Sequence, residues 1–189
     1  MKTKKTILFE FLKEFGFNRD QVENVIASIS SEPGRMFYSS SHRLVKDRKY
    51  FLITKTKTSE HHSFLIERNI PSISDPLRMI FNEIPIDKEF KLPKSPQTAA
   101  LDIEKLTFPL ILRKWQHGDK FKPLGMNNFK KVSDFFTDNK FSIPSKENTW
   151  LLLSDEEIVW IIGHRIDDRF KIRPLTKIAF VIQYLNEII

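Results

Sequence analysis

The 189-residue sequence contains no cysteine. This absence excludes structural disulfides and cysteine-ligated zinc, and it fits a reducing compartment such as the cytoplasm. The sequence also has no apolar run near the roughly 20 residues that a membrane-spanning helix requires. Met1 to Lys5 lead into an amphipathic segment and not into the apolar core of a signal peptide. We therefore expect a cytoplasmic protein that does not contact a membrane.

Signals for catalysis are sparse as well. Only five glycines are present, and they form no glycine-rich phosphate loop. The adjacent His61 and His62 cannot both face one site on a strand, and His42, His117 and His164 have no partner at the spacing of metal ligands. The sequence therefore predicts no catalytic residue, no metal site and no cofactor within this chain.

What the sequence does have is positive charge. Its 31 lysines and arginines outnumber its 24 aspartates and glutamates, which gives a formal net charge of +7 at pH 7. Such an excess favours an anionic partner, of which nucleic acid is one. Because many basic proteins bind nothing acidic, the position of the charge along the chain must decide.

The charge is concentrated between Arg113 and Phe136, in the run RKWQHGDKFKPLGMNNFKKVSDFF. Large apolar residues are interleaved with the cations, which indicates a packed scaffold that presents positive charge to a polyanion. The cations that we expect to contact phosphate here are Arg113, Lys114, Lys120, Lys122, Lys130 and Lys131. The residues that we expect to shape the loop are Gly118, Asp119, Pro123 and Gly125. The alternative is a solvated face of lysines without a ligand.

The aromatic residues of this run have two possible roles. We predict that Phe121, Phe135 and Phe136 fill the core and do not stack on bases. For Trp115 both roles stay open, although a base-paired stem offers few unpaired bases for stacking.

A second cationic stretch, GHRIDDRFK, runs from Gly163 to Lys171. Its Arg165 and Arg169 are further candidates for phosphate contact. Equally, either arginine can pair with Asp167 or Asp168 in a structural network of ion pairs.

The first part of the chain has the pattern of a helical hairpin. The segment from Ile7 to Phe15 is predicted to be a helix that ends at Gly16, and a second helix begins at Asn18, which forms a capping box with Gln21. The apolar face of this hairpin needs a further partner, either the strands that follow or a domain outside this chain. Strands predicted at 36–40, 43–47 and 50–54 form a β-meander.

The remainder is predicted to be mostly strands, at 64–67, 79–81, 99–103, 110–115, 150–153, 158–162 and 178–184, with a helix at 132–139. The stretch 87–96 is rich in proline and lysine and indicates a boundary or a crossing segment, so we place a boundary near Ser95. We expect an α+β fold with two domains. Residues 1–95 hold the helical hairpin and a small β-meander, and residues 96–189 form a compact mixed α/β domain.

Several motifs of this sequence resemble the C-terminal portion of tRNA(Ile)-lysidine synthetases. They are RxWxxGDxFxPLGM followed by KK and SDFF, and the later pattern GxRIDxRF. Less specific likeness to the linker and middle domain of these enzymes lies in KxxxxILFEFLKEFGFNxDQV and FYSSSHRLVKDR. The resemblance spans nearly the whole chain.

The resemblance implies a function. Such enzymes are ATP-dependent ligases of the PP-loop type, which adenylate the wobble cytidine in the CAU anticodon of tRNA(Ile) and join lysine to it, so that the codon read changes from AUG to AUA. ATP and Mg are implied for the full-length enzyme, bound by an N-terminal domain whose SGGxDS-like loop has no match here.

The resemblance also implies roles for the two parts of this chain. Residues 1–95 are expected to be a middle substrate-recognition domain, and residues 96–189 a C-terminal tRNA-binding domain. We therefore expect a portion that positions the tRNA, lacks the catalytic domain and is not catalytic alone, and that can form a homodimer through its helices. The alternative is a basic module for protein interaction or assembly without specific RNA binding.

Overall fold

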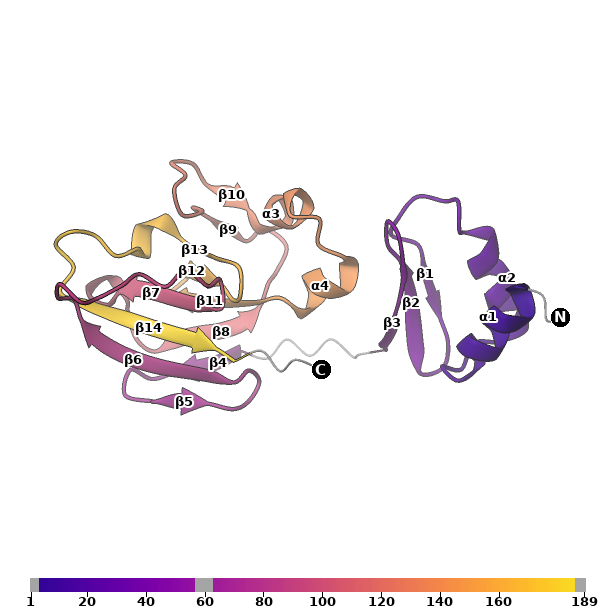
Figure 1. Ribbon diagram of the computed structural model, residues 1–189, viewed down its shortest axis with the longest axis horizontal. Coiled ribbons are helices and arrows are strands. Elements are labelled where there is room, and N and C mark those ends of the chain that lie inside the picture. The colour runs from indigo at the N-terminus through magenta and orange to yellow at the C-terminus, as the bar shows by residue number, and fades with distance from the viewer. Residues whose placement is uncertain (1–3, 57–62, 186–189) are drawn as a thin grey trace. The chain divides into compact units, whose positions relative to one another are not determined.

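The computed structural model describes residues 4–56 and 63–185, whose contacts group into two units (Figure 1). Of the described residues, unit 1 contains 4–56 and the short segment 141–147, and unit 2 contains 63–140 and 148–185. Within the described ranges, no helix is both long and apolar enough to cross a membrane.

Unit 1 begins with the predicted helical hairpin. Helix α1 (Lys4–Lys13) is followed by Gly16, whose φ of +79° is a conformation that other residues rarely adopt. Helix α2 (Arg19–Ala27) begins with the predicted capping box, in which Gln21 N–H donates to Asn18 Oδ1 and Asn18 N–H donates to Gln21 Oε1, both at 2.9 Å. The glycine stop and the capping box are confirmed.

The β-meander that follows is confirmed as an antiparallel sheet with the strand order β1-β2-β3. Its strands are β1 (Met36–Tyr38), β2 (His42–Lys46) and β3 (Phe51–Lys55). Leu12, Phe17 and Val22 of the helical hairpin share one buried cluster with Leu44 of β2. The strands are thus a partner for the apolar face of the hairpin.

The periodicity of the sequence places Phe11 and Ile29 in the apolar stripes of the two helices, but both side chains are exposed, as is Ile7. Ile29 is 57% exposed because α2 ends at Ala27, before the stripe reaches it. Phe11 is 55% exposed and contacts the ring of Phe15, with 5.5 Å between the centroids.

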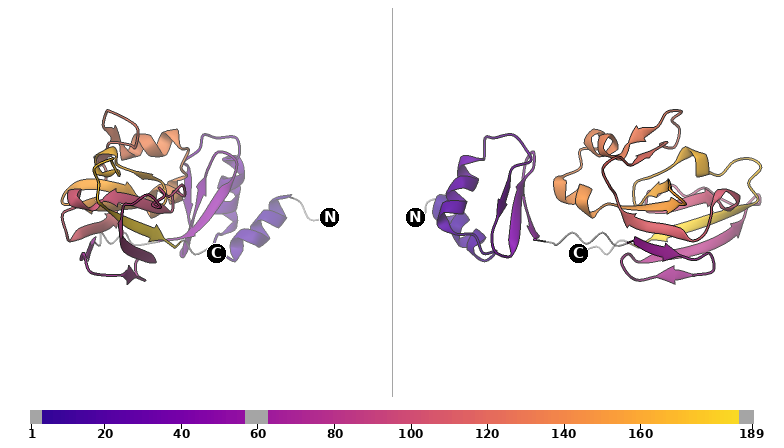
Figure 2. Two further views of the ribbon diagram at one scale, coloured as in Figure 1. Left: turned by 60° about the vertical axis from the view of Figure 1, so that its left-hand side comes forward. Right: turned by 180° about the vertical axis from the view of Figure 1, so that it is seen from behind.

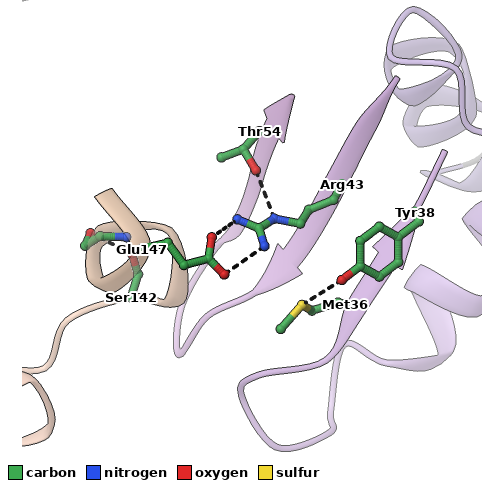
Figure 3. A network of polar contacts seen from close by, with 7 residues as sticks. Met36, Tyr38, Arg43, Thr54, Ser142 and Glu147 are labelled. Atoms are coloured by element: carbon green, nitrogen blue, oxygen red, sulfur yellow. Dashed lines mark hydrogen bonds and ion pairs between the residues drawn. The ribbon is translucent and has the colours of Figure 1, made fainter. Parts of the chain in front are cut away.

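An ion pair links the segment 141–147 to the sheet of unit 1 (Figure 3). Arg43 of β2 contacts both carboxylate oxygens of Glu147, with 2.9 Å between Nη1 and Oε1, and its Nε donates to Thr54 Oγ1 at 3.2 Å. The hydrogen bond with Glu147 raises the pKa of Arg43. Arg43 therefore stabilises unit 1 through its side-chain contacts with Glu147 and Thr54.

Unit 2 is built on two antiparallel sheets, ordered β13-β12-β11-β8-β4 and β5-β6-β14-β7. The strands of the first are β4 (Ser63–Ile66), β8 (Leu110–Lys114), β11 (Trp150–Ser154), β12 (Glu157–Ile161) and β13 (Arg165–Ile166). Those of the second are β5 (Ser72–Ile73), β6 (Met79–Pro85), β7 (Thr98–Asp102) and β14 (Ile178–Tyr184).

The core of unit 2 draws on both sheets. Leu112, Leu152 and Trp160 of the five-stranded sheet lie in one buried cluster with Phe81 and Phe180 of the four-stranded sheet. Burial of these large side chains is the main favourable contribution to the stability of this unit.

The division between the units does not coincide with the boundary expected near Ser95. Strand β4 pairs with β8, and β6 pairs with β14 along its whole length, from Met79 opposite Tyr184 to Pro85 opposite Ile178. Strands on both sides of Ser95 therefore share both sheets. Of the two interpretations of the stretch 87–96, the structure contains the crossing segment, which runs within unit 2.

The remaining elements of unit 2 lie around the basic run. A ribbon of β9 (Lys120–Phe121) and β10 (Lys130–Lys131) leads directly into α3 (Val132–Asp138), which lies beside it in all the views (Figures 1 and 2). The 3₁₀ helices η1 (Ile103–Lys105) and η2 (Asp168–Phe170) also belong to unit 2, whereas α4 (Ile143–Asn148) lies almost entirely in the segment 141–147 of unit 1. The α+β prediction is confirmed.

Candidate nucleic-acid interface

Residues 113–131, here called the basic loop, carry the cations first predicted to bind phosphate. Arg113 and Lys114 end strand β8, and the other four lie on or beside the β9–β10 ribbon. The register of the ribbon places Lys120 opposite Lys131, and Phe121 opposite Lys130. Residues directly opposite each other present their side chains on the same face, and like charges there are destabilising. The exposed Lys120 and Lys131 therefore form a pair of positive charges that an anion would stabilise.

An ion pair holds the first turn of the basic loop. Arg113 Nη2 donates to Asp119 Oδ1 at 2.8 Å, and Nη1 donates to Oδ2 at 2.9 Å. Asp119 also accepts from Gln116 N–H at 2.7 Å, and Gly118 between them has a φ of +97°. Asp119 and Gly118 thus form the turn, and the guanidinium of Arg113 is hydrogen-bonded within the protein.

The second turn, which contains Leu124 and Gly125, is held by residues 163–171, here called the arginine segment. Gly125 has a φ of +85°, and its N–H donates to Asp168 Oδ1 at 2.8 Å. Arg165 Nη2 donates to the carbonyl oxygen of Leu124 at 2.8 Å, while the arginine itself remains exposed. The basic loop and the arginine segment, far apart in the sequence, therefore form one site.

The buried carboxylate of Asp167 lies at the centre of this site. It is 0% exposed and accepts from Lys122 N–H at 2.7 Å, while Pro123 forms an isolated antiparallel bridge with the same residue. Arg169 donates to it through the backbone N–H at 2.9 Å, Nε at 3.0 Å and Nη2 at 2.9 Å, and also pairs with Glu157. Hydrogen bonding to Asp167 raises the pKa of Arg169. Of the two roles left open for Arg169, the structure contains the ion-pair network.

Two of the lysines also have partners within the protein. Lys130 pairs with Asp138 at the end of α3. Lys114 Nζ donates to the carbonyl oxygen of Asn148 at 2.7 Å and lies 4.4 Å from the ring centroid of Trp150. These contacts keep both ammonium groups at fixed positions.

The other three lysines predicted to contact phosphate have different surroundings. Within residues 4–56 and 63–185, no carboxylate lies at ion-pair distance from Lys120, Lys122 or Lys131. Their charges are therefore available to a ligand at a smaller cost than those of Arg113 or Arg169, whose partners would first have to be released.

Most aromatic rings of the basic run are packed inside. Phe121 and Phe136 are both 0% exposed, and Phe135 lies edge-on to Phe121 with 5.4 Å between the centroids. Trp115 packs edge-on to Phe136 at 5.1 Å. The structure thus shows the predicted packing of these phenylalanines. Of the two roles left open for Trp115, the structure contains packing.

A hollow of about 310 Å³ opens beside the arginine segment. Its apolar lining includes Leu124, Trp160 and Ile166. The cations at this hollow are Lys94, Arg165 and Lys171, of which Lys171 donates to Asp168 at 2.8 Å and so lowers the pKa of that carboxyl. Lys94 and Lys171 were not among the cations predicted to contact phosphate. Lys94 lies in the stretch 87–96, which is rich in proline and lysine, and Lys171 ends the arginine segment, so lysine content was their only signal.

The histidines show no arrangement of metal ligands in the part of the chain that is described. There, no group of three His, Asp or Glu side chains comes close enough to hold a metal ion. His61 and His62 fall outside the described residues. Burial lowers the pKa of His164, which favours its neutral form.

Two family models match this chain. The TilS substrate binding domain matches residues 1–57, and the TilS substrate C-terminal domain matches residues 110–180. The second match contains the whole of the basic loop and the whole of the arginine segment.

Curated relatives extend the likeness across the chain. The tRNA(Ile)-lysidine synthase of Parabacteroides distasonis is 44% identical over 182 residues, which are 96% of this chain and 42% of that protein. That of Bacteroides thetaiotaomicron is 39% identical over 173 residues, which are 92% of this chain and 38% of that protein. This chain therefore spans about two fifths of the length of these relatives.

A solved structure described as the crystal structure of a TILS C-terminal domain has a TM-score of 0.54 and 15% sequence identity. It covers 67% of this chain and 98% of that chain. At this identity the likeness establishes the fold alone.

Proposed function

The chain belongs to the tRNA(Ile)-lysidine synthase family, and from that premise we propose that it is a portion of such an enzyme that holds the tRNA substrate. In this proposal, unit 2 grips the phosphate backbone of the tRNA through the basic loop and the arginine segment. Unit 1, with its helical hairpin and β-meander, is the substrate-recognition domain.

The observation that carries this proposal is the pair of exposed lysines, Lys120 and Lys131, directly opposite each other on the β9–β10 ribbon. Two like charges at this position reduce the stability of the free protein, and a phosphate between them removes the repulsion. Lys122 and Arg165 extend the positive surface along the same site. Contacts to phosphate position an RNA without reading its sequence, which suits a domain that holds the body of a tRNA.

We propose that the full-length enzyme uses this grip to align the wobble cytidine of the CAU anticodon for ligation to lysine. Binding energy from contacts remote from the reacting atoms then supports the chemistry by orientation. ATP and Mg would act in a catalytic domain outside this chain. The residues present here do not fit these groups, because the five glycines stand singly, at positions 16, 34, 118, 125 and 163, and build no phosphate-binding loop. No step of ligation is therefore assigned to a residue of this chain.

A fluorescence-anisotropy titration tests the proposal. The chain is titrated with tRNA(Ile) bearing CAU and with elongator methionine tRNA, which shares the anticodon, at several salt concentrations. We expect salt-dependent binding with a steep slope of log K against log salt concentration, and tighter binding of tRNA(Ile). Equal binding of the two tRNAs would place discrimination outside this chain and leave the grip intact. Absence of binding at low salt would overturn the proposal and favour a module for protein interaction.

Two further properties belong to the same proposal. We infer that the protein works in the cytoplasm, where its tRNA substrate is found. We also infer a homodimer through the exposed side chains Ile7 and Phe11 of α1. Sedimentation equilibrium tests this, and a monomer at all concentrations used for the titration would exclude the dimer.

A further inference from the structure

One aromatic residue of the basic loop differs from the others. Phe129 is 55% exposed, whereas Phe121 and Phe136 are both 0% exposed and Trp115 packs on Phe136. All of residues 113–136 are described, so this contrast covers the whole basic run. The prediction that the phenylalanines of the run fill the core did not include Phe129, which the sequence pattern left without a role.

Two cations lie against this exposed ring. The guanidinium carbon of Arg169 is 5.0 Å from the centroid of Phe129, and Lys120 Nζ is 5.6 Å from it. Both distances are within the range of a cation–π contact. Because Asp167 and Glu157 hold Arg169, its guanidinium is a fixed neighbour that limits how the ring can move.

The strand that follows Phe129 also restricts the position of the ring. Phe129 immediately precedes β10, where Lys130 pairs with Phe121 and Lys131 pairs with Lys120. The exposed ring is therefore held next to the pair of lysines that the proposed function assigns to phosphate. An aromatic face beside cations is the combination that binds single-stranded nucleic acid, since the base stacks and its phosphate is neutralised.

We propose that Phe129 is a stacking platform for an unpaired base of the bound RNA, with Lys120 on the phosphate of the same nucleotide. This inference rests on the proposed function and adds to it a specific contact to a base. An unpaired base is required because the bases within a stem are already stacked on their neighbours. In a tRNA such bases lie in the single-stranded 3′ end and in the loops.

The variant Phe129→Ala removes the platform, and Phe129→Leu keeps apolar bulk without the aromatic face. Phe129→Trp retains a stacking ring. The matched control is Leu175→Ala, because Leu175 is 90% exposed but lies outside the basic loop, the arginine segment and the proposed dimer interface. All variants are made in the whole chain and compared with it in affinity for tRNA, salt dependence and thermal unfolding.

We expect Phe129→Ala and Phe129→Leu to bind about tenfold more weakly, a typical loss for one base–aromatic stack. The slope of log K against log salt should not change, because no phosphate contact is lost. Phe129→Trp and Leu175→Ala should bind as the unchanged chain does. Equal affinity of Phe129→Ala and the unchanged chain would overturn the inference, and so would a loss that is matched by a comparable fall in the unfolding midpoint.

A fluorescent base shows whether the base stacked on Phe129 comes from the single-stranded 3′ end or from a loop. One tRNA transcript carries 2-aminopurine in the 3′ single strand, and a second set carries it in the loops. Stacking on Phe129 should quench the fluorescence at one of these positions, and Phe129→Ala should abolish that quenching. Quenching at the 3′ end or in a loop supports the platform and identifies its base, and no Phe129-dependent quenching at any position overturns it.

The experiments distinguish failure of the proposed tRNA-binding function from failure of the stacking platform. If the unchanged chain does not bind tRNA at low salt, the proposed function fails and the platform with it. If the unchanged chain binds with a steep salt slope but Phe129→Ala changes neither affinity nor quenching, only the platform fails.

Discussion

Arg113 and Asp119 form a two-pronged ion pair across the first turn of the basic loop, with N–O distances of 2.8 and 2.9 Å. Their side chains are 18% and 11% exposed, so water screens the pair only in part. Arg113 Nη1 also donates to the carbonyl oxygen of Lys114 at 3.0 Å. The same arginine that the sequence pattern assigns to phosphate is thus a fixed part of the turn that carries the lysines.

We predict that Arg113→Lys lowers the free energy of unfolding by about 2 kcal/mol, because a lysine cannot reproduce the paired hydrogen bonds to the carboxylate. Urea denaturation measures the change. The control is Arg173→Lys, since Arg173 is exposed. If Arg113→Lys proves as stable as the unchanged chain, the ion pair with Asp119 does not hold the turn.

Asp167 provides a second prediction about stability. Its fully buried carboxylate accepts hydrogen bonds from Lys122 N–H and from three N–H groups of Arg169. In Asp167→Asn an amide NH₂ replaces one acceptor and faces these donors, while Arg169 loses its counter-charge. We expect a loss of about 3 kcal/mol. Guanidinium denaturation should show it with an unchanged m-value, and a loss below that of Arg113→Lys would contradict the central position given to Asp167.

Features set by neighbouring residues were predictable from the sequence. The capping box of Asn18 and Gln21 and the turn at Gly16 depend on backbone groups three or four positions away, and both were found. The last strand was predicted at its observed bounds, Ile178–Tyr184, because a continuous run of apolar and β-branched residues is typical of a strand buried on both faces.

Features that depend on distant pairing were not predictable in the same way. The division near residue 60 follows from β4 pairing with β8 and β6 with β14, and no local signal in the stretch 87–96 reveals those partners. The composition of the basic run likewise identified its cations but not their counter-charges. By contrast, the partner of Arg169 was one of the two carboxylates named from the sequence, because Asp167 lies only two residues away.

The acid stability of the site depends on Asp168. Hydrogen bonds from Lys171 and from Gly125 N–H lower the pKa of this carboxyl from its ordinary value of 3.8. A lowered pKa in the folded state means that the stabilisation is fully present above about pH 4 and is lost as the pH falls through the folded pKa. We therefore predict that unfolding free energies measured between pH 7 and pH 2 fall less steeply at the acid end in Asp168→Asn.

The control for this measurement is Asp155→Asn. Asp155 is exposed and has a φ of +51°, a conformation that asparagine also tolerates, so this exchange should leave the acid limb unchanged. If Asp168→Asn and Asp155→Asn have the same pH dependence as the unchanged chain, the hydrogen bonds to Asp168 do not contribute to stability.

Lys130 and Lys131 are adjacent in the sequence but differ in their surroundings, and this difference gives the sharpest test of the interface. Lys130 lies opposite Phe121 and pairs with Asp138, whereas Lys131 lies opposite Lys120. We predict that Lys131→Ala weakens tRNA binding and reduces the magnitude of the slope of log K against log salt by about 0.7 to 0.9, the value for one lost phosphate contact.

Lys130→Ala should change that slope less, because its ammonium group has a carboxylate partner that must be released before it can bind phosphate. Lys177→Ala removes an equal charge from an exposed position outside the basic loop, so it reports the effect of net charge alone. Anisotropy titrations of the three variants against one tRNA give the slopes directly. Since Lys131→Ala also relieves the repulsion with Lys120, it should not lower the unfolding midpoint of the free protein. Equal slopes for Lys131→Ala and Lys177→Ala would mean that the ribbon contributes only general charge, and the paired lysines would then lose their assignment as a phosphate site.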